Sequence, residues 1–84
     1  MAEFVERKFQ LAAVALATEL NYPQAARTLD ISLSELERQI TALETILSMK
    51  MFRTIGENVV VTNEGRVFVE GCQSFLEARD IMDR

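Results

Sequence analysis

Two short apolar patterns of helical period follow each other in the first half of the chain, with a sharp break between them. Pro23 suits the first turn of a helix, because its fixed φ angle and missing N–H do no harm there. Asp30 is one of the few non-glycine residues that tolerate the left-handed conformation in which helices often end. We therefore predict a helix from Asn21 to Asp30, a corner with Ile31 turned inward, and a second helix from Ser32 to Leu47. This is the layout of a helix-turn-helix.

The second of these helices has clear start signals and one apolar face. Ser32 stands three residues before Glu35, and Ser34 three residues before Glu37, which is the spacing of a capping box. Glu35 can cap its own helix with Ser32, so it need not face a partner. Glu37 either caps the helix together with Ser34 or faces a partner. The apolar face follows a helical period over Leu36, Ile40, Leu43 and Leu47. The opposite face, which we expect to be free for a partner, carries Glu37, Arg38, Thr41, Glu44 and Thr45.

The segments around this pair supply the rest of a small core. A helix is predicted from Glu3 to Leu20, and its apolar positions at helical spacing are Val5, Phe9, Ala12, Leu16 and Leu20. After the second helix of the pair, Met51 and Phe52 are expected to anchor the chain inward. β-Branched residues then lie on both sides of a turn at residues 56–58, which is typical of a short hairpin. Beside a helix-turn-helix such a hairpin is a wing.

A long last helix is predicted from Asn63 to about Met82, with Thr62 as its cap. It carries two lines of mainly apolar residues. One has heptad spacing and consists of Phe68, Cys72, Phe75, Arg79 and Met82, and the other consists of Val69 and Leu76. Since two lines exceed what one small domain buries, we expect one of them to meet a second chain. The alternative is a plain amphipathic helix packed on its own core. The chain is accordingly divided into residues 1–62 and a linker or dimerisation helix over residues 63–84.

Composition excludes several classes of function. With 84 residues the chain makes one domain with a small core. It has no histidine and a single cysteine, Cys72, so neither a disulfide nor a cluster of metal ligands is expected, and no cofactor is implied. No nucleophile has a candidate base beside it and no glycine-rich phosphate loop is present, so we do not expect an enzyme.

The charge and the hydropathy of the chain bear on its partners and location. The formal net charge is −4, although proteins that bind nucleic acid usually carry a basic patch. The first eight residues lack the pattern of a signal peptide. The most apolar segment, residues 9–20, is shorter than the roughly 20 residues that span a bilayer. We therefore expect a soluble, cytoplasmic protein that does not enter a membrane.

An ordered set of residues resembles the N-terminal winged helix-turn-helix domain of LysR-type transcriptional regulators. The resemblance covers nearly the whole chain and rests on Ala25-Ala26-x-x-Leu29, Ile31-Ser32, Leu36-x-Arg38-Gln39-Ile40-x-x-Leu43-Glu44-x-x-Leu47, Met51-Phe52, Gly56 and Thr62-x-x-Gly65. It implies a mainly α fold with a three-helix core, a short β-hairpin wing and a long C-terminal linker helix. It also implies pairing of two subunits through that linker helix, and a larger effector-binding domain that this sequence does not encode.

The resemblance also assigns candidate site residues. The positions that face double-stranded DNA in the family are occupied by Ser32, Leu33, Ser34, Glu37 and Arg38, and those of the wing by Arg53, Thr54 and Asn58. The candidate dimerisation residues come from the spacing in the last helix and are Phe68, Cys72, Phe75, Leu76, Arg79 and Met82. Arg38 is the best match, because an arginine can fork to guanine or clamp a phosphate.

The chain departs from the family at several positions. On the wing, Thr54 stands where the family commonly has arginine, and Glu57 and Asn58 replace residues that are often basic. Leu33 and Ser34 replace a common glutamine and proline, and Glu37 replaces a common serine. Leucine contacts a thymine methyl at most, and a carboxylate repels phosphate. The leading hypothesis is a sequence-specific DNA-binding domain of a bacterial transcription regulator, dimeric through its last helix. The alternative is a degenerate winged helix that serves protein interaction and dimerisation and has little affinity for DNA.

Overall fold

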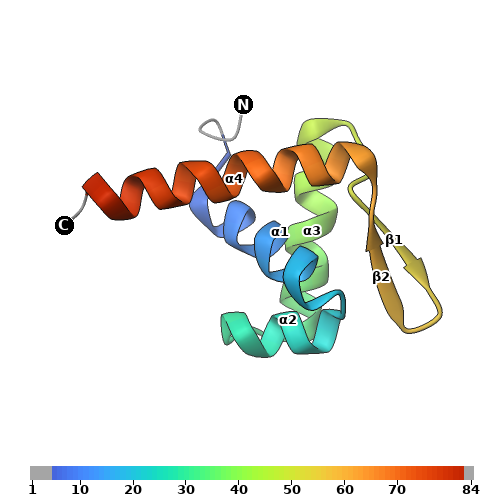
Figure 1. Ribbon diagram of the computed structural model, residues 1–84. Coiled ribbons are helices and arrows are strands. Elements are labelled where there is room, and N and C mark those ends of the chain that lie inside the picture. The colour runs from blue at the N-terminus through green and yellow to red at the C-terminus, as the bar shows by residue number, and fades with distance from the viewer. Residues whose placement is uncertain (1–4, 83–84) are drawn as a thin grey trace.

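The computed structural model describes residues 5–82, and it describes the side chains of residues 5–77. Within this range the chain forms four helices and one antiparallel hairpin (Figure 1). The elements are α1 (Arg7–Glu19), α2 (Tyr22–Leu29), α3 (Leu33–Leu47), β1 (Phe52–Ile55), β2 (Asn58–Val61) and α4 (Asn63–Met82). The predicted fold, a mainly α winged helix-turn-helix with a long last helix, is confirmed.

The first helix is shorter than the sequence predicted. Glu3 lies outside the described residues, and Glu6 is in a non-helical conformation with φ −57° and ψ 145°. The buried side chain of Gln10 donates a hydrogen bond of 2.8 Å to the carbonyl of Val5, which fixes the segment that precedes the helix. At the other end Leu20 has a left-handed φ of 55° and is partly exposed. Leu20 therefore ends α1 and is not the core residue that its spacing predicted.

The corner between α2 and α3 forms as predicted. The side chain of Asn21 caps α2 by accepting a hydrogen bond from the backbone of Gln24, and Pro23 lies in the first turn. Asp30 ends α2 in the left-handed conformation, with φ 58°. The N–H of Ile31 then bonds the carbonyl of Ala26, and this closing bond turns the chain into α3.

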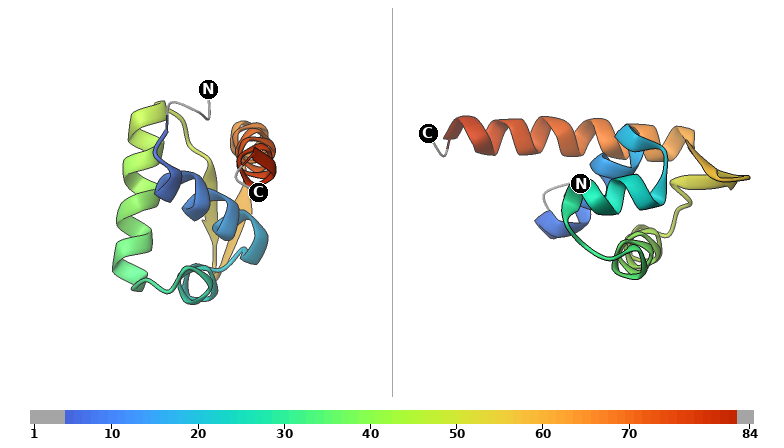
Figure 2. Two further views of the ribbon diagram at one scale, coloured as in Figure 1. Left: turned by 90° about the vertical axis from the view of Figure 1, so that its left-hand side faces the viewer. Right: turned by 90° about the horizontal axis from the view of Figure 1, so that it is seen from below.

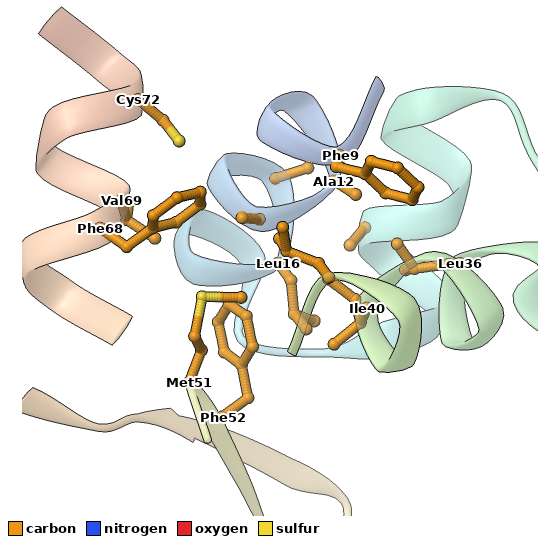
Figure 3. Packing of buried hydrophobic residues seen from close by; sticks show 14 of the residues in the cluster. Phe9, Ala12, Leu16, Leu36, Ile40, Met51, Phe52, Phe68, Val69 and Cys72 are labelled. Carbon is orange, nitrogen blue, oxygen red and sulfur yellow. The ribbon is translucent and has the colours of Figure 1, made fainter. Parts of the chain in front are cut away.

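The core lies where α1 crosses α3 and α4 (Figure 3). Leu36, Ile40 and Leu43 are almost fully buried and turn α3 toward α1. Ala12 and Leu16 of α1 meet them, and the small alanine allows the helices to approach closely. Each large aliphatic side chain buried in this way stabilises the fold by about 1.5–3 kcal/mol. Burial of these side chains fixes which face of α3 points into the core. It thereby also fixes which face of α3 is exposed.

The hairpin is attached to the rest of the domain at two places. Its register pairs Arg53 with Val60 and Ile55 with Asn58, and the turn uses Gly56 at a φ of 64°. On one side, the N–H of Val59 donates to the carbonyl of Leu20 at the end of α1 over 3.1 Å. On the other side, Met51 and Phe52 insert into the core (Figure 3).

The first half of α4 belongs to the same core. Thr62 caps α4 by accepting from the N–H of Gly65 over 3.0 Å, as predicted. Phe68, Val69 and Cys72 are buried with the side chains of α1. Described residues from both sides of the predicted boundary between residues 62 and 63 therefore share one hydrophobic core. Only the C-terminal part of α4 extends past the rest of the domain (Figures 1 and 2).

We predict that Gly65→Ala lowers the free energy of unfolding by about 1–3 kcal/mol, in the range of overpacked sites. A Cβ atom at this position would lie 2.4 Å from the carbonyl oxygen of Met51, and a backbone atom cannot move aside as easily as the end of a flexible side chain. Chemical denaturation measures the change.

Gly71→Ala is the matched control, because a Cβ atom there meets nothing within 4 Å. Its expected effect is a gain of about 0.5–1 kcal/mol, because glycine weakens the interior of a helix. Equal effects of the two substitutions would contradict the close approach of α4 to Met51.

Candidate nucleic-acid interface

The start of α3 forms an exposed polar surface. Ser32 caps the helix, and its hydroxyl accepts from the N–H of Glu35 over 3.0 Å. Because Ser32 is the cap, Glu37 is left as an exposed carboxylate on the outer face. Of the DNA-facing positions expected from the family resemblance, the structure brings five together at this end of α3, all of them exposed: Ser32, Leu33, Ser34, Glu37 and Arg38.

Arg38 is held by a carboxylate on its own helix. The Nε of Arg38 donates to Oε1 of Glu35 over 3.1 Å. The Nη2 of Arg38, on the same edge of the guanidinium, donates to Oε2 of Glu35. The largely buried Gln39 also donates to Oε2 of Glu35, over 2.8 Å. Hydrogen bonds from Arg38 and then from Gln39 hold the pKa of Glu35 below its usual value, and Glu35 in turn raises the pKa of Arg38. The pair is therefore charged on both sides at neutral pH.

A tyrosine of α2 lies beside the outer face of α3. Tyr22 of α2 is half-buried beside this face. Burial, with the charges of Glu44 and Glu37, raises the pKa of its hydroxyl. The tyrosine thus stays neutral at neutral pH. Of the two carboxylates, only Glu37 is an exposed charge on the outer face, because Glu44 is largely buried beside Lys50.

The wing presents its predicted residues on two different faces. Arg53 and Asn58 are exposed, and the strand register places both on the outer face of the hairpin. Thr54 is exposed on the opposite face. Within residues 5–77 no ion pair joins Arg53 to Glu57, so the arginine is not held across the turn. The tip of the hairpin and the start of α3 lie on the side of the molecule away from α4 (Figure 1).

Sequence reasoning missed two apolar residues of the wing. Ile55 and Val60 share the outer face with Arg53 and Asn58, and Ile55 is 65% exposed. The alternation of side chains along a strand could have predicted this position, because Ile55 lies two residues after Arg53 and Val60 two residues after Asn58, and residues two apart point to the same side.

The prediction that Glu44 is free to meet a partner is wrong. Its side chain is only 15% exposed, and Oε2 accepts from the N–H groups of Met51 and Phe52 over 2.8 and 3.2 Å. Oε1 lies 3.6 Å from Nζ of Lys50. The chain turns back after α3 and brings its unpaired N–H groups to this carboxylate, so Glu44 ties the start of the wing to α3.

The predicted dimerisation residues of α4 divide into three groups. Phe68 and Cys72 are buried in the core of their own domain, so their assignment to a surface between two chains is corrected. Burial also raises the pKa of the Cys72 thiol to about 11. Phe75 and Leu76 are half-buried near the end of the described side chains. The side chains of Arg79 and Met82 lie outside the described residues.

Two negative findings concern metal binding and membrane spanning in the described part of the chain. No group of three or more potential ligand side chains is placed there to hold a metal ion. Among the helices of residues 5–82, none combines the length and the apolar character needed to cross a membrane.

The fold and this surface define a winged helix-turn-helix protein. A family model described as "Bacterial regulatory helix-turn-helix protein, lysR family" matches residues 10–66, which is more than half of the chain. The chain therefore belongs to the LysR family of bacterial regulators.

Relatives and solved structures agree with this family. The chain is 40% identical over 72 residues to the HTH-type transcriptional regulator TfdS of Cupriavidus pinatubonensis, covering 84% of this chain and 24% of TfdS. It is 27% identical over 82 residues to the HTH-type transcriptional activator AaeR of Escherichia coli, covering 95% of this chain and 26% of AaeR. The chain thus spans about a quarter of the length of these curated relatives.

Two similar solved structures contain DNA. The DNA-binding domain of CbnR in complex with DNA has a TM-score of 0.89 and 25% identity, over 94% of this chain and 91% of that one. The DNA-binding domain of BenM in complex with benA site 1 DNA has a TM-score of 0.88 and 29% identity, over 93% of this chain and 91% of that one.

We predict that Glu44→Ala lowers the free energy of unfolding by about 1–3 kcal/mol, because it leaves two backbone N–H groups near the core without their acceptor. Glu37→Ala removes the same charge from the exposed face of the same helix and is expected to stay within about 0.5 kcal/mol of the parent. Urea denaturation of the two variants measures the difference. A Glu44→Ala variant as stable as Glu37→Ala would show that Glu44 is a surface residue after all.

Proposed function

We propose that this chain is a sequence-specific DNA-binding domain that inserts the start of α3 into the major groove, with the wing against the neighbouring backbone or minor groove. The arrangement is the one expected of a helix-turn-helix, whose second helix contacts base edges near its N-terminus. DNA complexes of the similar CbnR and BenM domains support the proposal. Such a domain works on the bacterial chromosome, and we place the protein in the cytoplasm.

One observation carries this proposal: Arg38 is exposed on the outer face of α3 while the opposite face of the same helix is buried. An arginine at this position can donate two hydrogen bonds to guanine or bind a phosphate. Ser32 and Ser34 have hydroxyls that suit phosphate oxygens, and Leu33 suits a thymine methyl group. On the wing, Arg53, Thr54 and Asn58 are the proposed contacts.

We further propose that two copies pair through the C-terminal part of α4. This part extends past the domain, so a second chain can reach it without disturbing the core (Figures 1 and 2). Its half-buried Phe75 and Leu76 offer apolar surface there. A dimer would present two copies of α3 to two half-sites, in the usual manner of helix-turn-helix proteins.

The acidic character of the chain favours a second candidate function. The net charge is −4, Glu37 is exposed, and Arg38 is already paired with Glu35. A winged helix with such a surface could serve as a protein-interaction and dimerisation module with little affinity for DNA. A stable dimer that fails to bind any duplex at low salt would favour this function over the first.

We predict that Arg38→Ala weakens binding to duplex DNA by about tenfold or more, since a good arginine contact is worth about 1–3 kcal/mol. Fluorescence anisotropy at low salt measures the affinity. Arg66→Ala is the control, because it removes the same charge from α4, which lies on the other side of the molecule from the start of α3. Equal binding by Arg38→Ala and the parent chain would mean that the proposed contacts are wrong.

We predict that Leu76→Glu shifts the chain from dimer to monomer, because a carboxylate cannot be buried between two apolar helices without a large cost. Sedimentation velocity over a concentration series reports the shift. Ser74→Glu, on the exposed side of α4, adds the same charge and should leave the dimer intact. If both variants associate like the parent, this part of α4 is not the interface.

A further inference from the structure

The contact between Glu35 and Arg38 differs from an ordinary surface ion pair. Exposed pairs usually contribute little, because two mobile side chains must be held in one geometry. Here the carboxylate engages two nitrogens on one edge of the guanidinium, and Gln39 holds that carboxylate from the buried side. Gln39 is only 7% exposed, so its position is fixed by the core. The pair is therefore anchored to the body of the domain.

This geometry changes what Arg38 offers to a partner. The Nε edge of the guanidinium is occupied by Glu35, which leaves its outer edge, with the remaining N–H groups, exposed to solvent. Arginine presents its donors as a planar fork, so one edge can be held while the other binds a second group. The carboxylate also cancels much of the positive charge that would attract phosphates from a distance.

We propose that Glu35 is a positioning residue for DNA recognition, which masks the charge of Arg38 against phosphate and leaves only the outer edge of its guanidinium for DNA. This inference rests on the proposed DNA-binding function. Sequence-independent affinity comes from phosphates that are neutralised by basic side chains. A masked arginine adds little to that affinity and keeps its donors for a close, directional contact. Glu35 thus accounts for an arginine at the centre of the interface of a chain whose net charge is −4.

The test uses Glu35→Gln, which keeps the length of the side chain and one carbonyl acceptor but removes the charge. Binding to a mixed-sequence duplex is measured by anisotropy across a salt series. The variant is expected to bind more tightly than the parent at low salt. Its plot of log affinity against log salt should be steeper by about 0.9, the change for one further neutralised phosphate. That slope corresponds to a roughly threefold to fourfold larger loss of affinity between about 50 and 200 mM salt.

Two controls separate masking of Arg38 from a general loss of negative charge. Glu37→Gln removes a charge from the same face of α3 without a contact to Arg38, and a much smaller change of slope is expected. Glu35→Gln is also made in an Arg38→Ala background. There its effect should fall to that of Glu37→Gln, since coupled residues are not additive.

Three outcomes overturn the inference. One is an unchanged or shallower slope for Glu35→Gln. Another is a slope change that persists without Arg38, which would make Glu35 a general repulsive charge. In both cases the parent still binds DNA, and the proposed function stands while the inference fails. The third outcome is no binding by the parent or any variant at low salt, and this removes the proposed function together with the inference.

Discussion

Residues 50–52 fix the wing and α4 against α3, and the geometry of the proposed interface depends on this junction. Glu44 of α3 accepts the N–H groups of Met51 and Phe52. The carbonyl of Met51 accepts from Thr62 over 2.9 Å, and the hydroxyl of Thr62 donates to the carbonyl of Lys50 over 2.7 Å. Three elements therefore share one short stretch of backbone. These bonds hold the start of the wing and the start of α4 to the end of α3.

The same junction explains why two small features of the sequence matter so much. Gly65 lets α4 pass against the carbonyl of Met51, where any side chain would collide with backbone. From sequence Glu44 resembles a surface residue. In the structure its carboxylate accepts the N–H groups of Met51 and Phe52, where the chain passes from α3 into the hairpin. Buried N–H groups need an acceptor, and here a single carboxylate supplies it.

Most of the fold could be predicted from sequence, because its determinants are local. Pro23, Asp30, Ser32 and Thr62 marked helix ends through capping and backbone preferences, and the structure places each at the predicted boundary. The start of α1 could not be found, since a buried hydrogen bond from Gln10 to Val5 replaces a helical turn there. Val5 fits the helical spacing, and the predicted helix therefore includes it. That spacing does not reveal the hydrogen bond from Gln10.

The candidate site was only partly predictable. Spacing placed Arg38 and its neighbours on the outer face of α3, because a helix buries one stripe and exposes the other. The role of Glu44 depends on residues seven and eight positions further along, which no helical pattern brings together. The burial of Phe68 and Cys72 likewise depends on how α4 lies across α1, a tertiary contact that heptad spacing does not distinguish from contact with a second chain.

The proposed function requires a negatively charged chain to bind negatively charged DNA. The chain is acidic as a whole, and even the face with Arg38 carries Glu35 and Glu37. A protein of this kind cannot depend on a broad positive field to find DNA. Its recognition has to come from a few short-range contacts, held in place by the buried stripe of α3 and by the junction at Met51.

The proposed binding mode has the outer face of the start of α3 and the wing in contact with DNA, with α4 clear of it. An NMR titration of the labelled chain with duplex DNA at low salt distinguishes these surfaces. We expect the largest shifts of the backbone amides at residues 32–38 and 53–58, with little change in residues 63–72 of α4. Shifts that cluster on α4 instead, or none in either region, would contradict this binding mode.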